Sequence, residues 1–191
     1  RGDEYTAISA MSVATASELQ SASTVYPDWL SPTYFYLSSS VTDRTRQLAR
    51  DIVADAGATN PYDQAKALES WLRSNIIYNE SIPAPPNGRD PVDWVLFDYQ
   101  EGYCNYYASA MIVMLRELGI PSRMAAGFAQ GTWDPQENAY MVTERDAHTW
   151  VEAYFPGYGW IEFEPTAAQA RLEREGDQDI TPQQQVAPPA Q

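Results

Sequence analysis

The fold of this 191-residue chain is limited most by an apolar run that begins at its only cysteine, Cys104. The run continues through residues 108–115 and stops at Gly119, with Pro121 close behind. A long apolar segment that ends in glycine predicts a buried helix, with Cys104 in its first turn and Gly119 at the C′ position. Unpaired backbone N–H groups and the positive end of the helix dipole favour the thiolate there. Cys104 is therefore a candidate nucleophile.

Two further helices are expected before this segment. One covers residues 42–56, and Thr42 is its N-cap. The other covers residues 60–74, where Asn60 is the N-cap and Pro61 takes the first helical position. Apolar residues recur near helical spacing in both segments, so we interpret these stripes as faces that pack into a core.

Strand patterns dominate the chain after the cysteine segment. Residues 147–155 alternate in polarity, and residues 160–164 return after a Pro-Gly-Tyr-Gly turn, which predicts an antiparallel hairpin. Shorter strands are expected over residues 76–78, 122–128 and 139–143, with a turn region over residues 133–138. Because helices come first and strands later, we expect an α+β fold in which the cysteine helix packs on an antiparallel sheet.

Composition changes along the chain predict three parts. Residues 1–40 are rich in Ser, Thr, Ala and Tyr, show a weak helical pattern over residues 7–20, and are interpreted as an N-terminal wrap over the body. Residues 41–168 form the core domain, in which a loop with four prolines, residues 81–91, precedes the cysteine. Residues 169–191 are interpreted as a Pro/Gln-rich linker tail.

The charge balance limits the classes of partner. The chain has 26 acidic and 12 basic residues, a formal net charge of −14, which argues against binding to nucleic acid or to an anionic membrane surface. A single cysteine allows no intrachain disulfide, and no apolar run reaches the length of a membrane span. Since the chain starts at Arg1, we interpret it as a fragment of a longer protein.

The chain also contains one histidine, His148, on the predicted strand 147–155. A cysteine and a histidine are the minimum for a thiol nucleophile with its base. Glu164 is the candidate third member. If Tyr154 pairs with Trp160, Glu164 lies on the same face as His148 and diagonal to it, whereas a shift by one residue turns it to the other face. A five-residue loop, or a four-residue loop with a bulge, is therefore predicted.

Two other carboxylates compete for the place beside the histidine. Asp146 lies one two-residue step away and stays possible. Glu152 shares the face of His148 but lies about 13 Å along the strand. Taken singly, a lone cysteine is usually a small buried apolar residue and most carboxylates are solvated, so the hypothesis depends on the combination.

In that combination each residue has a distinct role. Cys104 attacks an acyl carbon such as that of a carboxamide, while His148 takes the thiol proton and later protonates the leaving amine. Glu164 holds the imidazole in one tautomer and favours its cation. The oxyanion would accept hydrogen bonds from the Cys104 backbone N–H and from a second donor, either Trp94 or Tyr103.

Four short sequence motifs follow one another between residues 102 and 166. They read as G-x-C at residues 102–104, L-R-x-x-G-I-P-x-R at 115–123, H-x-W-x-E at 148–152, and G-W-x-x-x-E-P-T at 159–166. Together they resemble the transglutaminase-like core, a papain-like fold. The Asn-Pro-Tyr helix start at residues 60–62 and the loop at 89–93 resemble more narrowly the bacterial membrane-anchored transglutaminases of the TgpA type.

The resemblance implies a Cys-His-Asp triad, which falls on Cys104, His148 and Glu164. Glu164 stands where the family usually has Asp, so its carboxylate is one methylene longer. The resemblance also implies a protein or peptide substrate that carries a glutamine amide, and a domain held outside the cytoplasmic membrane of a bacterium by a membrane-anchored parent. Animal members require calcium, but no calcium-loop pattern occurs here, so we expect no metal and no cofactor.

Three hypotheses follow for the function. The first is a cysteine acyltransferase of transglutaminase type that passes through a thioester. The second is a cysteine peptidase or amidase with the same triad and water as the acceptor. The third is an inactive binding module that retains the fold. We place the first slightly ahead of the second and the third behind both.

Overall fold

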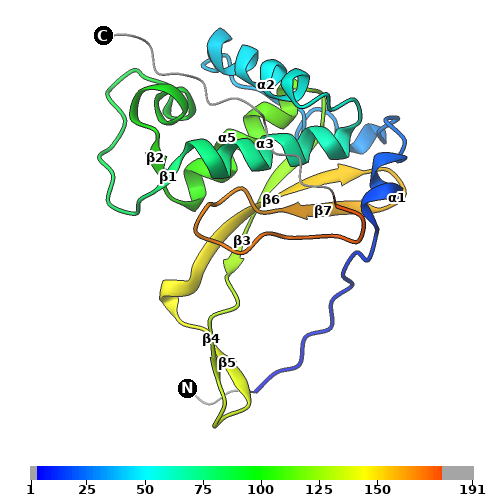
Figure 1. The fold of residues 1–191 in the computed structure, drawn as a ribbon, viewed down its shortest axis with the longest axis vertical. Coiled ribbons are helices and arrows are strands. Elements are labelled where there is room, and N and C mark those ends of the chain that lie inside the picture. The colour runs from blue at the N-terminus through cyan, green and yellow to red at the C-terminus, as the bar shows by residue number, and fades with distance from the viewer. Residues whose placement is uncertain (1–3, 178–191) are drawn as a thin grey trace.

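Helices and strands form two layers in the computed structural model, which describes residues 4–177 (Figure 1). The helical layer covers one face of a three-stranded antiparallel sheet, as the predicted α+β class requires. The helices are α1 (Ala16–Gln20), α2 (Asp43–Asp55), α3 (Pro61–Asn75), α4 (Pro91–Asp93) and α5 (Cys104–Glu117). Shorter helical segments are η1 (Asp28–Leu30), η2 (Trp94–Tyr99) and η3 (Glu144–Asp146).

The central sheet has the strand order β3-β6-β7. Strand β6 (Ala147–Phe155) pairs antiparallel with β3 (Ser122–Phe128) on one side and with β7 (Gly159–Phe163) on the other. All three lie within one residue of their predicted bounds, because their alternating patterns are clear. Two small ladders join β1 (Ile77–Tyr78) to β2 (Glu101–Gly102) and β4 (Thr132–Asp134) to β5 (Ala139–Met141).

The cysteine helix, α5, lies at the centre of the core. It packs against α2, α3 and strand β6, and its inward-facing residues from Tyr107 to Leu115 are buried. The helix ends as the sequence predicts. Gly119 follows the C-cap with φ +74°, a backbone conformation that glycine adopts without strain. The Ile120 N–H then donates to the Leu115 carbonyl at 2.9 Å, which satisfies one carbonyl of the last turn.

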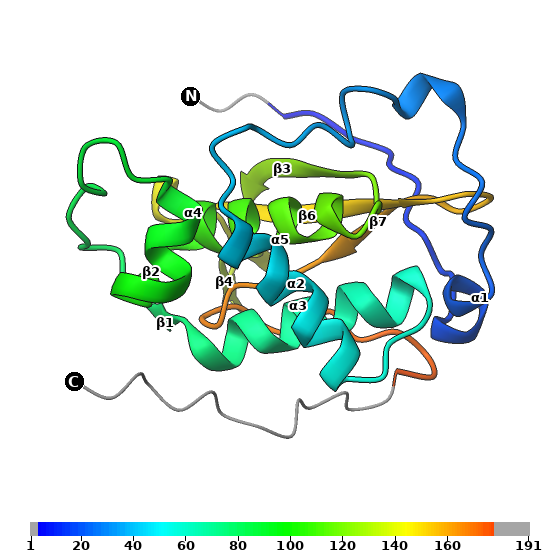
Figure 2. The ribbon, with the colours of Figure 1, turned by 90° about the horizontal axis from the view of Figure 1, so that it is seen from above.

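The two earlier helices also begin where their capping residues predict. The Thr42 hydroxyl accepts a hydrogen bond from the Thr45 N–H at 3.3 Å. The Asn60 side chain accepts one from the Asp63 N–H at 3.0 Å. These bonds satisfy N–H groups that the first turn of a helix leaves unpaired. Figure 2 looks down on the helical layer and shows α2, α3 and α5 above the strands.

The prediction of a helix over residues 7–20 is wrong for most of its length. Only α1 is helical, because a capping box between Thr15 and Glu18 starts the helix at Ala16. Residues 7–13 are exposed and belong to no helix or strand, whereas Ala14, Ala16 and Leu19 are buried in the core.

The turn predicted over residues 133–138 is also partly wrong. Trp133 and Asp134 belong to β4, where Trp133 pairs with Tyr140 of β5 and the two ring centroids lie 5.0 Å apart. This cross-strand aromatic contact extends the hairpin beyond what local turn residues suggest. The β4–β5 hairpin projects from the sheet (Figure 1). Among the described residues, no helix has the length and apolar character needed to cross a bilayer.

Candidate functional site

Cys104 is the first residue of α5 and is partly exposed. The N-cap residue, Tyr103, makes no side-chain capping bond in the described structure, so the first N–H groups of α5 are left for another acceptor. The thiol lines a cavity of about 260 Å³. The other residues around this cavity, the thiol cavity, are Tyr78, Glu80, Tyr103, Arg145 and Ala147. A side chain that entered it would reach the sulfur.

The β1–β2 ladder sets the wall of the thiol cavity. It aligns Tyr78 with Gly102, two residues before the cysteine. Gly102 has little room for a side chain, because an added Cβ would lie 3.0 Å from the Cβ of Tyr106. The glycine in the G-x-C block therefore permits the close approach of the chain to the first turn of α5.

His148 and Glu164 are hydrogen-bonded to each other. The distance from Nε2 of His148 to Oε2 of Glu164 is 2.6 Å, and both residues are buried. The register that the sequence analysis required is confirmed, since Tyr154 pairs with Trp160. The loop is shorter than predicted: Phe155 also pairs with Gly159, which leaves three residues, 156–158, between the strands. A loop with an odd number of residues, either three or five, keeps the side chains of His148 and Glu164 on the same face of the sheet.

The remaining groups of Glu164 are held from two directions. Its second carboxylate oxygen, Oε1, accepts a hydrogen bond from the Thr166 N–H at 2.9 Å. Its backbone N–H donates to Oε1 of Glu69 on α3 at 2.7 Å. The guanidinium of Arg73, also on α3, donates to the backbone carbonyls of Glu164 and Thr166 at 2.8 and 2.7 Å. The orientation of this carboxylate is thus fixed by α3 as well as by the sheet.

Glu69 is a buried acid that the sequence analysis missed. It is 1% exposed and pairs with Lys66, one turn earlier, at 2.7 Å. Burial raises the pKa of Glu69 above its ordinary value, and the charge of Lys66 acts in the opposite direction. The only sequence signal was a lysine and a glutamate three residues apart inside an apolar helix, a spacing equally common on solvated faces.

The two competing carboxylates are engaged elsewhere. Glu152 pairs with Arg123 on the neighbouring strand at 2.5 Å. Asp146 accepts hydrogen bonds from the backbone and the hydroxyl of Thr143 at 2.7 and 2.9 Å. Of the three acids considered beside His148, Glu164 is therefore the one that the structure brings to the imidazole.

The start of α5 is joined to the strand of His148 by a hydrogen bond between the residues that follow Cys104 and His148. Asn105 follows the cysteine and Thr149 follows the histidine, and the Thr149 hydroxyl donates to Oδ1 of Asn105 at 3.0 Å. The thiol donates to the same oxygen, with an S···O distance of 3.8 Å. Within residues 4–177, neither the thiol nor Nδ1 of His148 makes a hydrogen bond to the other. Catalytic hydrogen bonds are often long without substrate and shorten when it binds.

The two residues considered as oxyanion donors have different surroundings. Trp94 is buried and stacks on Tyr99 with a centroid distance of 4.6 Å, and it is not among the described residues that line the thiol cavity. Tyr103 does line this cavity, and it also borders a second one of about 230 Å³ beside Val92 and Tyr106. The position of Tyr103 is the better match for a donor near the sulfur.

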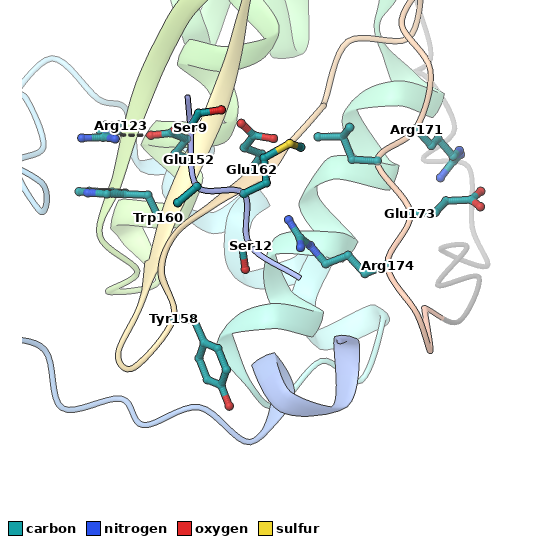
Figure 3. Close-up of a pocket in the computed structure, with 13 residues that line it drawn as sticks. Ser9, Ser12, Arg123, Glu152, Tyr158, Trp160, Glu162, Arg171, Glu173 and Arg174 are labelled. Carbon is teal, nitrogen blue, oxygen red and sulfur yellow. Dashed lines mark hydrogen bonds and ion pairs between the residues drawn. The ribbon is translucent and has the colours of Figure 1, made fainter. Parts of the chain in front are cut away.

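A larger cavity, of about 850 Å³, lies farther along the sheet (Figure 3). It is bounded by residues 9–12, by β6 and β7, and by residues 171–174. Figure 3 shows Arg123 paired with Glu152 at its edge, and the guanidinium also lies 4.2 Å from the ring centroid of Trp160. Cys104 and His148 do not line this cavity, so its size does not bear on the thiol chemistry.

Comparisons with known proteins agree on one family. The family model described as "Transglutaminase-like superfamily" matches residues 46–165. "Uncharacterized protein YebA" of Bacillus subtilis is 41% identical over 139 residues, which cover 70% of this chain and 19% of that protein. "Protein-glutamine gamma-glutamyltransferase" of Pseudomonas aeruginosa is 41% identical over 133 residues, which cover 69% of this chain and 20% of that protein. The chain thus spans about a fifth of the length of both relatives.

A solved structure gives the same result. The crystal structure of the periplasmic domain of TgpA from Pseudomonas aeruginosa superposes with a TM-score of 0.62 and 31% sequence identity. The match covers 74% of this chain and 48% of that one. The match to the family model, residues 46–165, includes Cys104, His148 and Glu164.

Proposed function

The chain belongs to the transglutaminase-like superfamily, and we propose that it is a cysteine acyltransferase of transglutaminase type. Its substrate would be the side-chain carboxamide of glutamine in a protein or peptide. The observation that carries the proposal is the buried 2.6 Å hydrogen bond between His148 and Glu164. The strand of His148 is also linked to the start of α5, because Thr149 donates a hydrogen bond to Asn105. A relative at 41% identity is named a protein-glutamine gamma-glutamyltransferase, which supports the same chemistry.

The first half of the proposed reaction forms a thioester. Nδ1 of His148 takes the proton of Cys104, and the sulfur attacks the carboxamide carbon of glutamine. The carbonyl oxygen becomes an oxyanion, which the Cys104 backbone N–H and a second donor such as Tyr103 would stabilise. The imidazolium then protonates the nitrogen, the C–N bond breaks, and ammonia leaves. Glu164 stabilises the imidazolium through Nε2, so Nδ1 stays directed to the thiol side.

The second half transfers the acyl group. A primary amine attacks the thioester carbon, the C–S bond breaks, and the excess proton on nitrogen passes through His148 to the sulfur. The product is an isopeptide or substituted amide, and the free thiol is regenerated. If water attacks instead, the same steps give glutamate, which is the hydrolase alternative.

We also propose the setting of the domain. The solved neighbour is a periplasmic domain, which supports an extracytoplasmic position on a membrane-anchored parent in a bacterium. The proposed catalytic core is residues 41–168, with residues 1–40 as the N-terminal wrap and residues 169–191 as the tail. Part of that tail packs on the core domain, since Nζ of Lys66 lies 3.5 Å from Oδ2 of Asp177. Residues 178–191 lie outside the described residues.

The test is incorporation of a primary amine into a glutamine-containing protein. Fluorescent cadaverine and casein with blocked lysines serve as acceptor and donor, and ammonia release is measured in parallel. The background is low because Lys66, the only lysine in the sequence, is buried and ion-paired. We expect incorporation that Cys104→Ala abolishes. Ammonia release without incorporation would replace the transferase with a hydrolase, and the absence of both would favour a binding module.

A further inference from the structure

Two opposite charges line the thiol cavity. They are carried by Glu80, just after β1, and by Arg145, in η3. Both side chains are exposed, and within residues 4–177 neither forms an ion pair. Most other arginines of the described chain are paired with a carboxylate or a backbone carbonyl, as Arg73 and Arg123 are. The two charges therefore remain free to contact a substrate that enters beside Cys104.

The position of Glu80 is set by its surroundings. The Tyr78 hydroxyl donates to Oε1 of Glu80 at 2.7 Å. The segment that carries both residues is tied to β2, since the Asn79 N–H donates to the Gly102 carbonyl at 2.9 Å and the Asn79 side chain donates to Glu101 at 2.7 Å. The Glu80 carboxylate is thus held at the edge of the thiol cavity by the same ladder that positions the chain before Cys104.

The tyrosine is suited to orient this carboxylate at neutral pH. Burial and the neighbouring charge of Glu80 both raise the pKa of Tyr78 above its ordinary value of 10.0. The phenol therefore stays protonated and acts as a hydrogen-bond donor. One oxygen of Glu80 is occupied by this bond, and the other remains available for a second donor.

An acceptor amine presents a specific problem of charge. A primary alkylamine has an ordinary pKa of about 10.4, so it reaches the enzyme as an ammonium ion. It must be bound as a cation and must lose one proton to the solvent before its nitrogen can attack the thioester. A carboxylate in the lining of the thiol cavity would concentrate the cation there, while a guanidinium in the same lining would repel the cation from its own vicinity.

We propose that Glu80, oriented by Tyr78, is the subsite that binds the ammonium group of the acyl acceptor, a lysine side chain or another primary alkylamine. This inference rests on the proposed transferase function. Arg145, which lines the same cavity, repels a cationic acceptor from its own vicinity. Lys66, the only lysine in the sequence, is buried in its pair with Glu69 and is therefore not the acceptor.

The test compares a cationic acceptor with a neutral one. Cadaverine is an ammonium ion at neutral pH, whereas hydroxylamine is uncharged there, and both attack thioesters. In Glu80→Gln we expect kcat/KM for cadaverine relative to hydroxylamine to fall about two- to fivefold, the upper part of the range for one exposed ion pair. The fall comes from KM for cadaverine and shrinks at high salt, because salt screens exposed charges. Glu144→Gln, which removes a nearby exposed acid outside the lining of the cavity, retains the wild-type ratio.

Each outcome has a separate meaning. An unchanged ratio in Glu80→Gln, or an equal loss with both amines, would overturn the acceptor subsite while the transferase function stands. A wild-type chain that releases ammonia but incorporates neither amine would overturn the transferase function and the subsite with it. A fall in the ratio in Glu144→Gln equal to that in Glu80→Gln would assign the effect to the general acidic surface and would also overturn the subsite.

Discussion

His148 and Glu164 are 9% and 6% exposed and lie within a network of short hydrogen bonds, whereas Glu80 and Arg145, which line the thiol cavity, are exposed. The two sets border the same proposed site. The buried set, the base side, is held by the sheet and by α3 through Glu69. In the exposed set, the substrate side, Glu80 follows the short β1–β2 ladder and Arg145 lies in η3.

This difference separates two tasks within the site. A catalytic base must keep the same orientation in every turnover, and burial among hydrogen-bonded partners achieves this. Groups that recognise substrates must be reachable, so they stay solvated and contribute less individually. Substitutions on the base side should therefore reduce catalysis or stability strongly, and substitutions on the substrate side should change selectivity by small factors.

The largest effect is expected from the carboxylate behind the histidine. Glu164→Gln retains a hydrogen-bond acceptor for Nε2 but removes the charge that stabilises the imidazolium. We expect kcat to fall about 10²- to 10⁴-fold with KM little changed, measured as amine incorporation. Glu164→Asp is the matched control, because it restores the residue that the family usually carries and should retain more activity. Equal activity of Glu164→Gln and wild type would remove Glu164 from the proposed triad.

A smaller effect, on stability, is expected from the ion pair below the carboxylate. Lys66→Met leaves Glu69 buried without its cation, which should lower the free energy of unfolding by about 3 kcal/mol in urea titrations. The double variant Lys66→Met, Glu69→Gln should recover most of this loss, since a neutral amide can still accept from the Glu164 N–H. Equal losses in both variants would show that packing, not charge, explains the effect.

The pH dependence of the Lys66→Met variant has a defined sign. The folded pKa of Glu69 is already raised by burial, and loss of Lys66 raises it further. A carboxyl group whose folded pKa exceeds its unfolded pKa binds more protons in the folded state, so its contribution to stability grows as pH falls and is lost as pH rises. The destabilisation of Lys66→Met should therefore be smaller at pH 5 than at pH 8.

The smallest effect is expected from the ion pair between Asp93 of α4 and Arg44 of α2. Asp93 is 2% exposed, and Arg44 lowers its pKa below the ordinary value of 3.8. A lowered folded pKa gives stability that is present above pH 3.8 and is lost as pH falls further. Arg44→Met should weaken this dependence, so the difference in urea midpoint between pH 6 and pH 3 becomes smaller than in wild type. An unchanged difference would mean that Arg89, which also pairs with Asp93, suffices.

The parts of the fold that the sequence predicted are those set by local patterns. Strand β6 alternates over nine residues and α5 ends at a glycine, so their bounds followed from spacing. Spacing left two hairpin registers open, and the hypothesis of a triad required the one in which Tyr154 pairs with Trp160, which the structure has. The loop came out shorter than expected because pairing continued to Phe155 and Gly159, and local turn residues do not fix where pairing stops.

The parts that could not be predicted depend on contacts between distant residues. Glu69 supports Glu164 across 95 positions of the chain, and nothing in the helix pattern distinguishes it from a solvated acid. Tyr78 and Glu80 line the thiol cavity because β1 pairs in parallel with β2. Strands of two residues are too short to show a sequence pattern, so this pairing could not be predicted.

In the proposed mechanism His148 activates the thiol of Cys104. This step is tested by the rate of alkylation by iodoacetamide at neutral pH, in wild type and in His148→Ala, where the single cysteine makes the readout specific. We expect rapid alkylation of the wild type and a rate at least about tenfold lower in the variant, because the thiolate has lost its cationic partner. Equal rates in the two proteins, or an unreactive wild-type thiol, would contradict it.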